Sequence, residues 1–277
     1  MPATGKVIAG LASIGLLVTG LAASTGNAPA AADESAGQTT TANAAGNRTE
    51  DCPIKEYSMG LRYQQSPTVD AMQRQAWLLA QDRLSAKAGP PQQNAKKAVV
   101  VDLDETVLDN TALLARDLQA CHDYTSWDTW KHWEREGDPA LIPGAAEFFD
   151  YADERGFAIY YISDRYEENK KHTIDTLTRL GLPQVSEDNV LLHSDQTPGK
   201  DERRAVVSET HEITLLVGDS LHDFRDAFGE SKSSDAELLA DNIEHIGRDW
   251  IVLPNSSYGD WDEGDLEAWD APLRTEN

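Results

Sequence analysis

Asp102 and Asp104 stand two residues apart, directly after the short β-branched run at 98–101. If that run is a strand, both side chains point in one direction, because side chains alternate along an extended chain. Two carboxylates held close do not both ionise cheaply, so such a pair tends to divide into one charged and one protonated member. A charged carboxylate can attack phosphorus, and a neutral one can protonate a departing oxygen. The alternative is a solvated acidic turn, because a lone Asp-x-Asp spacing has little specificity in so acidic a chain.

Four later residues extend this chemistry. Ser163 can donate a hydrogen bond to a phosphoryl oxygen, and Lys200, after Pro198-Gly199, can neutralise charge on a nucleophile and on a phosphoryl group. Asp219 and Asp223 lie about one helical turn apart, and together with Asp102 they offer hard oxygen ligands that suit Mg²⁺. The alternatives are a local serine cap, an exposed lysine, and a helix cap provided by Asp219 or by the following serine.

Alternating strands and helices would have to position these residues. Apolar runs predict strands at about 98–101, 157–162, 190–192 and 213–217, and helical patterns cover about 67–84, 144–156, 167–180 and 201–210. This alternation predicts the α/β class, with a parallel sheet covered by helices on both faces. In such sheets ligands bind beyond the carboxyl ends of the strands, where three of the acidic or hydroxyl motifs stand.

Four ordered motifs resemble those of the haloacid dehalogenase (HAD) superfamily and, more narrowly, the bacterial class C acid phosphatases. They are 100–110 (VVDLDETVLDN), Ser163-Asp164-Arg165, Lys200 and 218–224 (GDSLHDF). The resemblance runs from about Ile54 to Pro254. It implies a three-layer α/β/α sandwich with a small, mainly helical cap inserted at about 111–141.

The resemblance also implies an activity and a set of roles. It points to an exported, Mg²⁺-dependent acid phosphatase that hydrolyses small phosphomonoesters, with nucleoside monophosphates as candidate substrates. Asp102 would be the nucleophile that forms an aspartyl-phosphate, and Asp104 would be the general acid and base. Ser163 and Lys200 would hold the phosphoryl group. The Mg²⁺ ligands would be Asp102, the backbone carbonyl of Asp104, and Asp219, with Asp223 in support.

Three positions depart from the family pattern. Leu113 stands where a tyrosine is usual, Asp164 replaces an asparagine, and Ser220 replaces another asparagine. None of them removes a group that the chemistry requires. Substrate specificity is therefore less securely implied than activity.

Three tryptophans, Trp127, Trp130 and Trp133, recur every third residue within the predicted cap. On one helix they would form a stripe. Such a stripe is typical of a buried helix face, so we expect the set to pack the cap onto the main domain. The alternative is a stacking surface for a base or an aromatic alcohol.

The charge balance limits the partners. The 277 residues include 48 acidic and 24 basic side chains, for a formal net charge of −24. Nucleic acid polymers and anionic membrane surfaces are excluded, because both require clustered Lys and Arg. A small phosphorylated substrate is compatible, since a bound cation can reverse the local field within a cleft. The oligomeric state is left open.

The amino-terminal segment predicts targeting. A lysine at position 6, an apolar stretch at 7–23 and the small residues Ala28-Pro29-Ala30 are typical of a signal peptide over residues 1–30. We expect a secreted or cell-envelope protein with no stable membrane anchor after cleavage, the alternative being a retained anchor. Residues 31–50 have a linker composition. The HAD-like domain would span 51–277, with an acidic tail at about 256–277.

Two questions stay open at this level. Cys52 and Cys121 are the only cysteines, and in an oxidising compartment they could form a disulfide or remain free thiols. The rival functions are a non-catalytic secreted binding or storage protein on the same scaffold, and a phosphotransferase that passes the aspartyl-phosphate to an alcohol. The presence of Asp102 counts against the first, and product analysis in glycerol separates the second.

Overall fold

A five-stranded parallel sheet forms the centre of the protein. The computed structural model describes residues 52, 54–229, 231–259, 261, 270–272 and 274. The predicted signal peptide (1–30) and the predicted linker (31–50) lie outside these residues. The strand order is β5-β4-β1-β6-β7, and all four pairings are parallel. The strands are β1 (Lys97–Val101), β4 (Ala158–Tyr166), β5 (Val190–His193), β6 (Glu212–Gly218) and β7 (Trp250–Val252).

Helices cover both faces of this sheet, which confirms the predicted three-layer α/β/α sandwich. Val99 and Val101 of β1 are buried in one cluster with residues of α2 and α6, whereas Val100 belongs to a second cluster with Val207 of α8. Alternate side chains of one strand thus enter opposite apolar layers, as expected for a sheet that is buried on both sides. The helices are α2 (Pro67–Lys87), α3 (Pro91–Asn94), α6 (Ala145–Glu154), α7 (Lys170–Arg179), α8 (Lys200–Ser208) and α9 (Lys232–Asp241).

Local sequence signals explain where these helices begin. Ser66 is the N-cap of α2 and accepts a hydrogen bond from the Val69 amide at 3.4 Å, and Pro67 occupies the first turn. Gly144 precedes α6 with φ of 97°, a conformation that costs glycine least. Its hypothetical Cβ would also lie 3.1 Å from that of Trp77. A small residue is needed here for both reasons.

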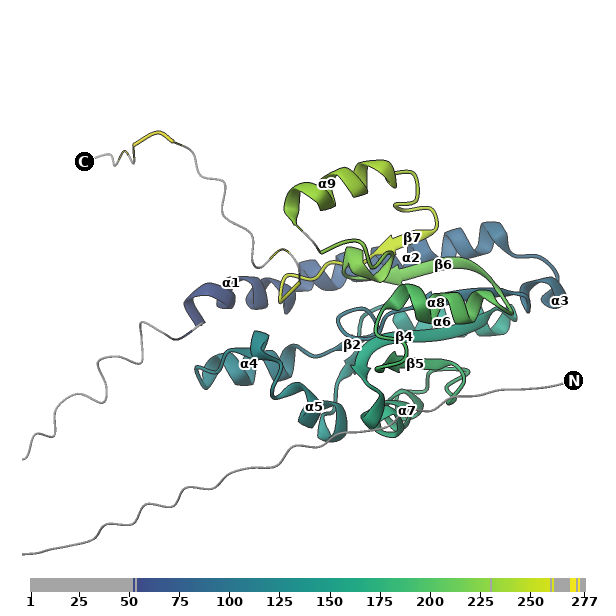
Figure 1. The fold of residues 1–277 in the computed structure, drawn as a ribbon, viewed down its shortest axis with the longest axis horizontal. Coiled ribbons are helices and arrows are strands. Elements are labelled where there is room, and N and C mark those ends of the chain that lie inside the picture. Colours follow the sequence, from purple (N-terminus) through teal and green to yellow (C-terminus); the bar gives the residue numbers. More distant parts are fainter. Residues whose placement is uncertain are drawn as a thin grey trace, which may run out of the picture. The chain divides into compact units, whose positions relative to one another are not determined.

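A group of helices lies beyond the carboxyl ends of the strands. Figure 1 shows α1 (Ile54–Gln64), α4 (Thr111–Gln119) and α5 (Trp130–Glu136) together at one end of the sheet. Their shared apolar cluster contains Leu61, Leu113, Leu114, Leu118 and Trp130. The strands β2 (Leu108–Asp109) and β3 (Ala140–Leu141) form a short antiparallel pair, which brings together the two ends of the chain segment that contains α4 and α5. We call α1, α4 and α5 the cap.

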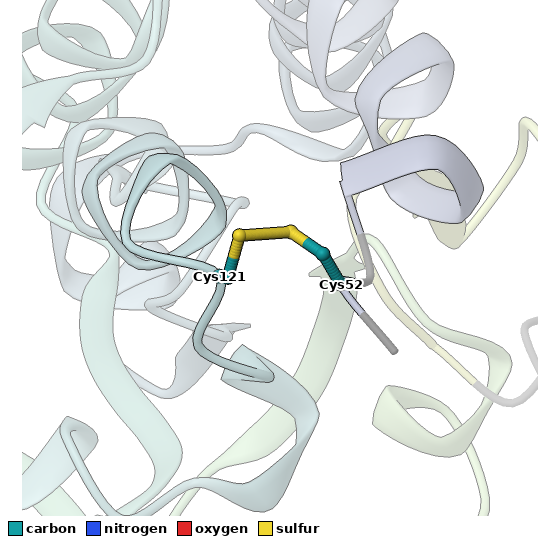
Figure 2. Close-up of a disulfide and its surroundings, with 2 residues drawn as sticks. All are labelled: Cys52 and Cys121. Atoms are coloured by element: carbon teal, nitrogen blue, oxygen red, sulfur yellow. A yellow bond between two sulfur atoms is a disulfide. The ribbon is translucent and has the colours of Figure 1, made fainter. Parts of the chain in front are cut away.

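A disulfide fastens the first helix of the cap to the second. Cys52 and Cys121 are bonded, with their Cα atoms 4.9 Å apart. Figure 2 shows the bond between the segment just before α1 and the turn that follows α4. The structure therefore decides a question that the sequence left open. In the part of the chain that the structure describes, no helix is both long and apolar enough to cross a membrane.

Candidate active site

All six residues that the sequence singled out line one cavity of about 980 Å³. Three neighbouring strands bring them together: Asp102 follows β1, Ser163 lies in β4 and Asp219 follows β6. The other three stand in the segment after β1, at the first position of α8 and in the 3₁₀ helix η3 (Leu221–Asp223), and they are Asp104, Lys200 and Asp223. The carboxyl ends of the central strands thus carry the site, as the α/β pattern predicts.

Lys200 lies among carboxylates. Its Nζ is 2.6 Å from Oδ1 of Asp102, 2.5 Å from Oδ1 of Asp223 and 3.6 Å from Oδ2 of Asp164. Burial alone would lower the pKa of Lys200, but Asp102 and Asp223 outweigh it and raise that pKa well above its ordinary value. Lys200 is therefore a permanent cation at the floor of the cavity.

Three carboxylates beside this lysine form a possible cation site. Oxygens of Asp102, Asp219 and Asp223 all lie within 4.8 Å of one another. With all three carboxylates ionised and Lys200 counted, the group would carry two uncompensated negative charges in a buried place. Burial, with a smaller contribution from the charge of Asp223, raises the pKa of Asp219 to about 8, which reflects the cost of ionising these neighbours together. A hard divalent cation would remove this penalty, so the donor set fits Mg²⁺ in both charge and chemistry.

Hydrogen bonds hold the two carboxylates after β6 in place. Thr106 Oγ1 and Asn255 Nδ2 donate to the two oxygens of Asp219 at 2.7 and 2.9 Å. The Ser220 amide donates to Oδ2 of Asp223 at 2.9 Å. Ser220 also caps η3, which was the alternative weighed for this position. Capping and a metal-ligating role for the neighbouring aspartates are thus compatible.

Asp104 is surrounded by donors. Arg165 Nε lies 3.0 Å from both carboxylate oxygens of Asp104, and its Nη2 lies 2.7 Å from Oδ1. Asn110 Nδ2 donates to Oδ1 at 2.9 Å and Ser163 Oγ donates to Oδ2 at 3.3 Å. Such a fork-like arginine contact fixes the plane of a carboxylate as well as its position.

Sequence reasoning assigned no role to Arg165 or Asn110. Both residues stood inside the motifs, and both side chains are buried. The available signal was an arginine directly after a predicted apolar strand, since a guanidinium that is buried there requires an acidic partner. For Asn110 there was no comparable signal.

The departures from the family pattern occupy different environments. Leu113 is buried in the apolar cluster of the cap and does not line the cavity. Asp164 lines the cavity, and its Oδ1 accepts a hydrogen bond from Arg203 Nη2 at 2.5 Å. Although burial would raise the pKa of Asp164, the positive charges of Lys200 and Arg203 lower it below its ordinary value. The substitution at 164 thus adds a negative charge to the mouth of the site.

Aromatic side chains form the outer wall of the cavity. Tyr57, Trp127, Trp130 and Tyr258 all line it. The Trp127 ring makes edge contacts with the rings of Trp130 and Tyr258, at centroid distances of 5.4 and 5.1 Å. The wall therefore combines residues from α1, from the chain between α4 and α5, from α5 itself, and from the carboxyl-terminal segment.

The predicted tryptophan stripe is wrong for one member. Trp130 is buried and Trp133 is half-buried on α5, in line with a packing role. Trp127 lies before the helix begins, with φ of 59°, and its exposed ring faces the cavity. The turn at Trp127 interrupts the helical period, so this side chain leaves the packed face.

A buried glutamate ties the carboxyl-terminal segment to the site. The Tyr258 hydroxyl donates to Oε2 of Glu105, and the backbone N–H of Asn110 donates to Oε1 at 2.9 Å. Glu105 is fully buried. Burial raises its pKa to about 8, and the charge of Asp104 acts in the same direction. Part of the predicted tail at 256–277 thus docks on the domain.

Glu105 should make the metal-free protein less stable as pH rises. Its pKa is about 8 in the folded chain against 4.5 ordinarily, so Glu105 holds its proton more tightly in the folded state than in the unfolded state. The stability that this difference provides is present at low pH and is lost as pH rises from 5 to 8. We expect this group to account for about 3 kcal/mol of the decline in unfolding free energy. Denaturant titrations with a chelator, across this pH range, measure it. The Glu105→Gln variant should show a flatter profile, and a profile parallel to the wild type would contradict the assignment.

Comparisons with known proteins agree with this fold and site. The family model for HAD superfamily, subfamily IIIB (acid phosphatase), matches residues 20–261. A solved structure of the class C acid phosphatase from Bacillus anthracis is similar, with a TM-score of 0.69 and 32% identity over 79% of this chain and 93% of that one. A second structure of that enzyme, with tungstate bound, has a TM-score of 0.69 and 31% identity over 80% of this chain and 93% of that one.

The parallel sandwich with acidic side chains at its strand ends defines a HAD-like hydrolase. The chain belongs to HAD superfamily subfamily IIIB, the acid phosphatases, because the family model covers most of its length. It is accordingly a phosphoric monoester hydrolase. A non-catalytic binding or storage role, weighed from the sequence, is disfavoured by this result.

Proposed function

We propose that this acid phosphatase is an exported, Mg²⁺-dependent enzyme that hydrolyses small phosphomonoesters through an aspartyl-phosphate on Asp102. One observation carries the proposal: buried Asp102 lies within 2.6 Å of Lys200 and shares an oxygen cluster with Asp219 and Asp223. This arrangement brings a nucleophile, a fixed positive charge and a cation-binding donor set together at one end of the sheet.

In the first step, an oxygen of Asp102 bonds to phosphorus while the bond to the leaving alcohol breaks. Lys200 keeps Asp102 in place and draws the phosphoryl group towards it. Ser163 lines the same cavity, and its hydroxyl would turn from Asp104 to a phosphoryl oxygen when the substrate binds. Phosphoryl transfer depends mainly on such positioning and on neutralising negative charge. When bound by Asp102, the Asp104 carbonyl and Asp219, with Asp223 in support, Mg²⁺ would supply most of that neutralisation.

Asp104 moves the protons in both steps. It donates a proton to the departing alkoxide, which leaves as an alcohol, and then accepts one from the water that attacks the aspartyl-phosphate. The second attack releases inorganic phosphate and restores Asp102. Because Arg165, Asn110 and Ser163 all donate to Asp104, its carboxylate form is well accommodated.

The cavity suits an ester whose leaving alcohol carries an aromatic ring. Its floor is polar, its outer wall carries Trp127 and Tyr258, and its volume of about 980 Å³ exceeds that of a phosphate ion. Nucleoside monophosphates combine a phosphate with a ring that can stack on such a wall, so they are the substrates we propose. The Bacillus anthracis relative with tungstate bound holds a tetrahedral oxyanion, the shape that a phosphate would present.

Export rests on two features of the chain. The first thirty residues have the composition of a signal peptide. The disulfide between Cys52 and Cys121 is the second, since such bonds persist mainly in oxidising compartments. Fractionation of cells that produce the full chain, followed by mass measurement of the extracellular or envelope-bound form, tests both cleavage and location.

Removal of divalent metal should abolish the activity. We expect chelation to lower kcat by at least about 10³-fold and Mg²⁺ to restore it, because the carboxylate cluster otherwise repels the substrate. Binding should also release protons, since burial raises the pKa of Asp219 to about 8 in the free cluster. Phosphate release from nucleoside monophosphates and simple esters, measured with chelator and graded Mg²⁺ at several pH values, tests this.

The same assay contains the outcomes that would contradict the proposal. Full activity in chelator would remove Mg²⁺ from the mechanism. An Mg²⁺ affinity that does not weaken as pH falls would contradict the cluster as its site. Analysis of products in the presence of glycerol tests the phosphotransferase alternative, which predicts glycerol phosphate in place of free phosphate.

A further inference from the structure

We infer that Trp133 of the cap is a positioning residue for the acid/base carboxylate of Asp104, and that it acts through the side chain of Asn110. The inference deepens the proposed function, because it rests on the role given there to Asp104. It gives the third tryptophan of the cap a task that neither packing nor substrate stacking describes.

Two consecutive hydrogen bonds join the cap helix to the carboxylate. The indole Nε1 of Trp133 donates to Oδ1 of Asn110 at 2.7 Å. Asn110 Nδ2 then donates to Oδ1 of Asp104 at 2.9 Å. Asn110 is fully buried, so no solvent molecule can take over either contact without a change in packing. The first bond spans 23 residues of chain and connects α5 to the segment after β1.

The chemistry of the donors fixes the direction of this relay. An indole nitrogen can only donate, so it requires the oxygen of the Asn110 amide on its side. Arg165 Nη2, also a pure donor, approaches that same oxygen at 3.4 Å. The amide nitrogen is therefore turned towards Asp104. Loss of the indole N–H would leave the buried Asn110 oxygen with only the longer contact, and the amide would be held less firmly.

The neighbouring residue on α5 attaches the helix to the other support of Asp104. Buried Glu134 accepts a hydrogen bond from Asn169 Nδ2 at 2.7 Å and a longer one from the Tyr166 amide at 3.3 Å. Tyr166 directly follows Arg165, the guanidinium partner of Asp104. Helix α5 thus contacts both segments that supply donors to Asp104. A shift of α5 would therefore move the donors that orient this carboxylate.

A role in proton transfer has a distinctive consequence for substrates. An alkyl alkoxide is a poor leaving group and needs the proton from Asp104, whereas p-nitrophenolate leaves readily without one. Misplacement of Asp104 should therefore slow the first phosphoryl transfer from an alkyl phosphate more than that from p-nitrophenyl phosphate. A merely structural defect would slow both esters by the same factor.

The test compares Trp133→Phe with the wild type on glycerol 3-phosphate and p-nitrophenyl phosphate, over a range of pH with saturating Mg²⁺. We expect kcat/KM, which reports the first phosphoryl transfer and not the later hydrolysis common to both esters, to fall about tenfold for the alkyl ester, the usual upper effect of one lost hydrogen bond, with a much smaller change for the aryl ester. KM should change little for either ester. The ratio of the two kcat/KM values is the quantity that a merely structural role would leave unchanged.

Two further variants serve as controls. Trp77→Phe, in the core between α2 and α6, removes an indole whose Nε1 has no hydrogen-bond partner among the described residues, and it should leave the ratio of the two rates unchanged. Asn110→Ala removes the relay itself. In that background Trp133→Phe should add no further leaving-group effect, because the two residues act in series.

The outcomes separate the inference from the function on which it rests. Equal losses on both esters, or additive effects of Trp133→Phe and Asn110→Ala, would overturn the role of Trp133. Asp104→Asn, assayed alongside, should show the strongest alkyl-selective loss, and its failure to do so would instead refute the acid/base role of Asp104. If Trp133→Phe folds poorly, replacement of the indole by benzothiophene keeps the ring shape and removes only the N–H.

Discussion

Asp102→Asn is expected to lower kcat by at least about 10⁴-fold, the scale seen when an enzyme loses its nucleophile. An amide cannot form the acyl phosphate, and the change also replaces a carboxylate ligand of the cluster with Asp219 and Asp223 by a neutral amide oxygen. Phosphate release from a nucleoside monophosphate and from p-nitrophenyl phosphate, with Mg²⁺ present, measures the loss. Activity within tenfold of the wild type would refute covalent catalysis by this residue.

The same variant should still fold. The Asp102→Asn change removes one acidic group from the crowded carboxylates around Lys200, so the metal-free cluster repels itself less. We therefore expect a free energy of unfolding in chelator no lower than that of the wild type. Asp175→Asn is a matched control, because Asp175 lies on α7 in an exposed ion pair with Lys171. It should change neither activity nor stability measurably.

Loss of the disulfide is expected to lower the free energy of unfolding by about 4 kcal/mol in the loop-entropy model. The bond joins residues that are 69 positions apart, so it restricts a long stretch of the unfolded chain. The doubly substituted Cys52→Ser, Cys121→Ser protein, unfolded in guanidinium without reductant, measures the effect. Reduction of the wild type with dithiothreitol should reproduce it.

Folding should survive that loss, because Leu61 of α1 remains packed against Leu114 of α4 and its neighbours. We expect a protein of lower stability with native-like circular dichroism. A difference of less than about 1 kcal/mol between the two forms would show that the unfolded chain is already restricted without the bond.

Much of the architecture could be predicted because strong local signals coincide with tertiary requirements. The run at 98–101 is buried on both sides and reads as apolar throughout, so strand β1 was evident. Ser66-Pro67 marks the beginning of α2 equally well. The acidic residues of the site were found because parallel strands bring their carboxyl ends to one edge, whatever the sequence distance between them.

Other elements show no hydrophobic periodicity from which the sequence could predict them. Strand β7 has three residues, Trp250–Val252, too few to show alternation. Helix α9 buries none of its residues, so it has no apolar stripe, and α1 follows directly on a segment with linker composition. These elements owe their form to tertiary contacts that a local pattern does not record.

The partners of the catalytic candidates were also beyond sequence reasoning. Asn110 and Arg165 reach Asp104 from separate segments, and their orientation depends on side-chain packing. Trp127 left the predicted stripe because a single turn with positive φ precedes α5. In each case the decisive variable is a dihedral angle or a rotamer, which composition and spacing leave free.

Tyr57 and Tyr258 lie near opposite ends of the described sequence, yet both side chains line the same cavity. Fusion partners or affinity tags joined close to either residue would therefore stand next to the entrance for substrate. Proteolytic trimming that reached position 258 would also remove the hydroxyl that Glu105 contacts and expose the rings of Trp127 and Trp130. Preparations of this enzyme that differ only at their ends should accordingly differ in which esters they prefer.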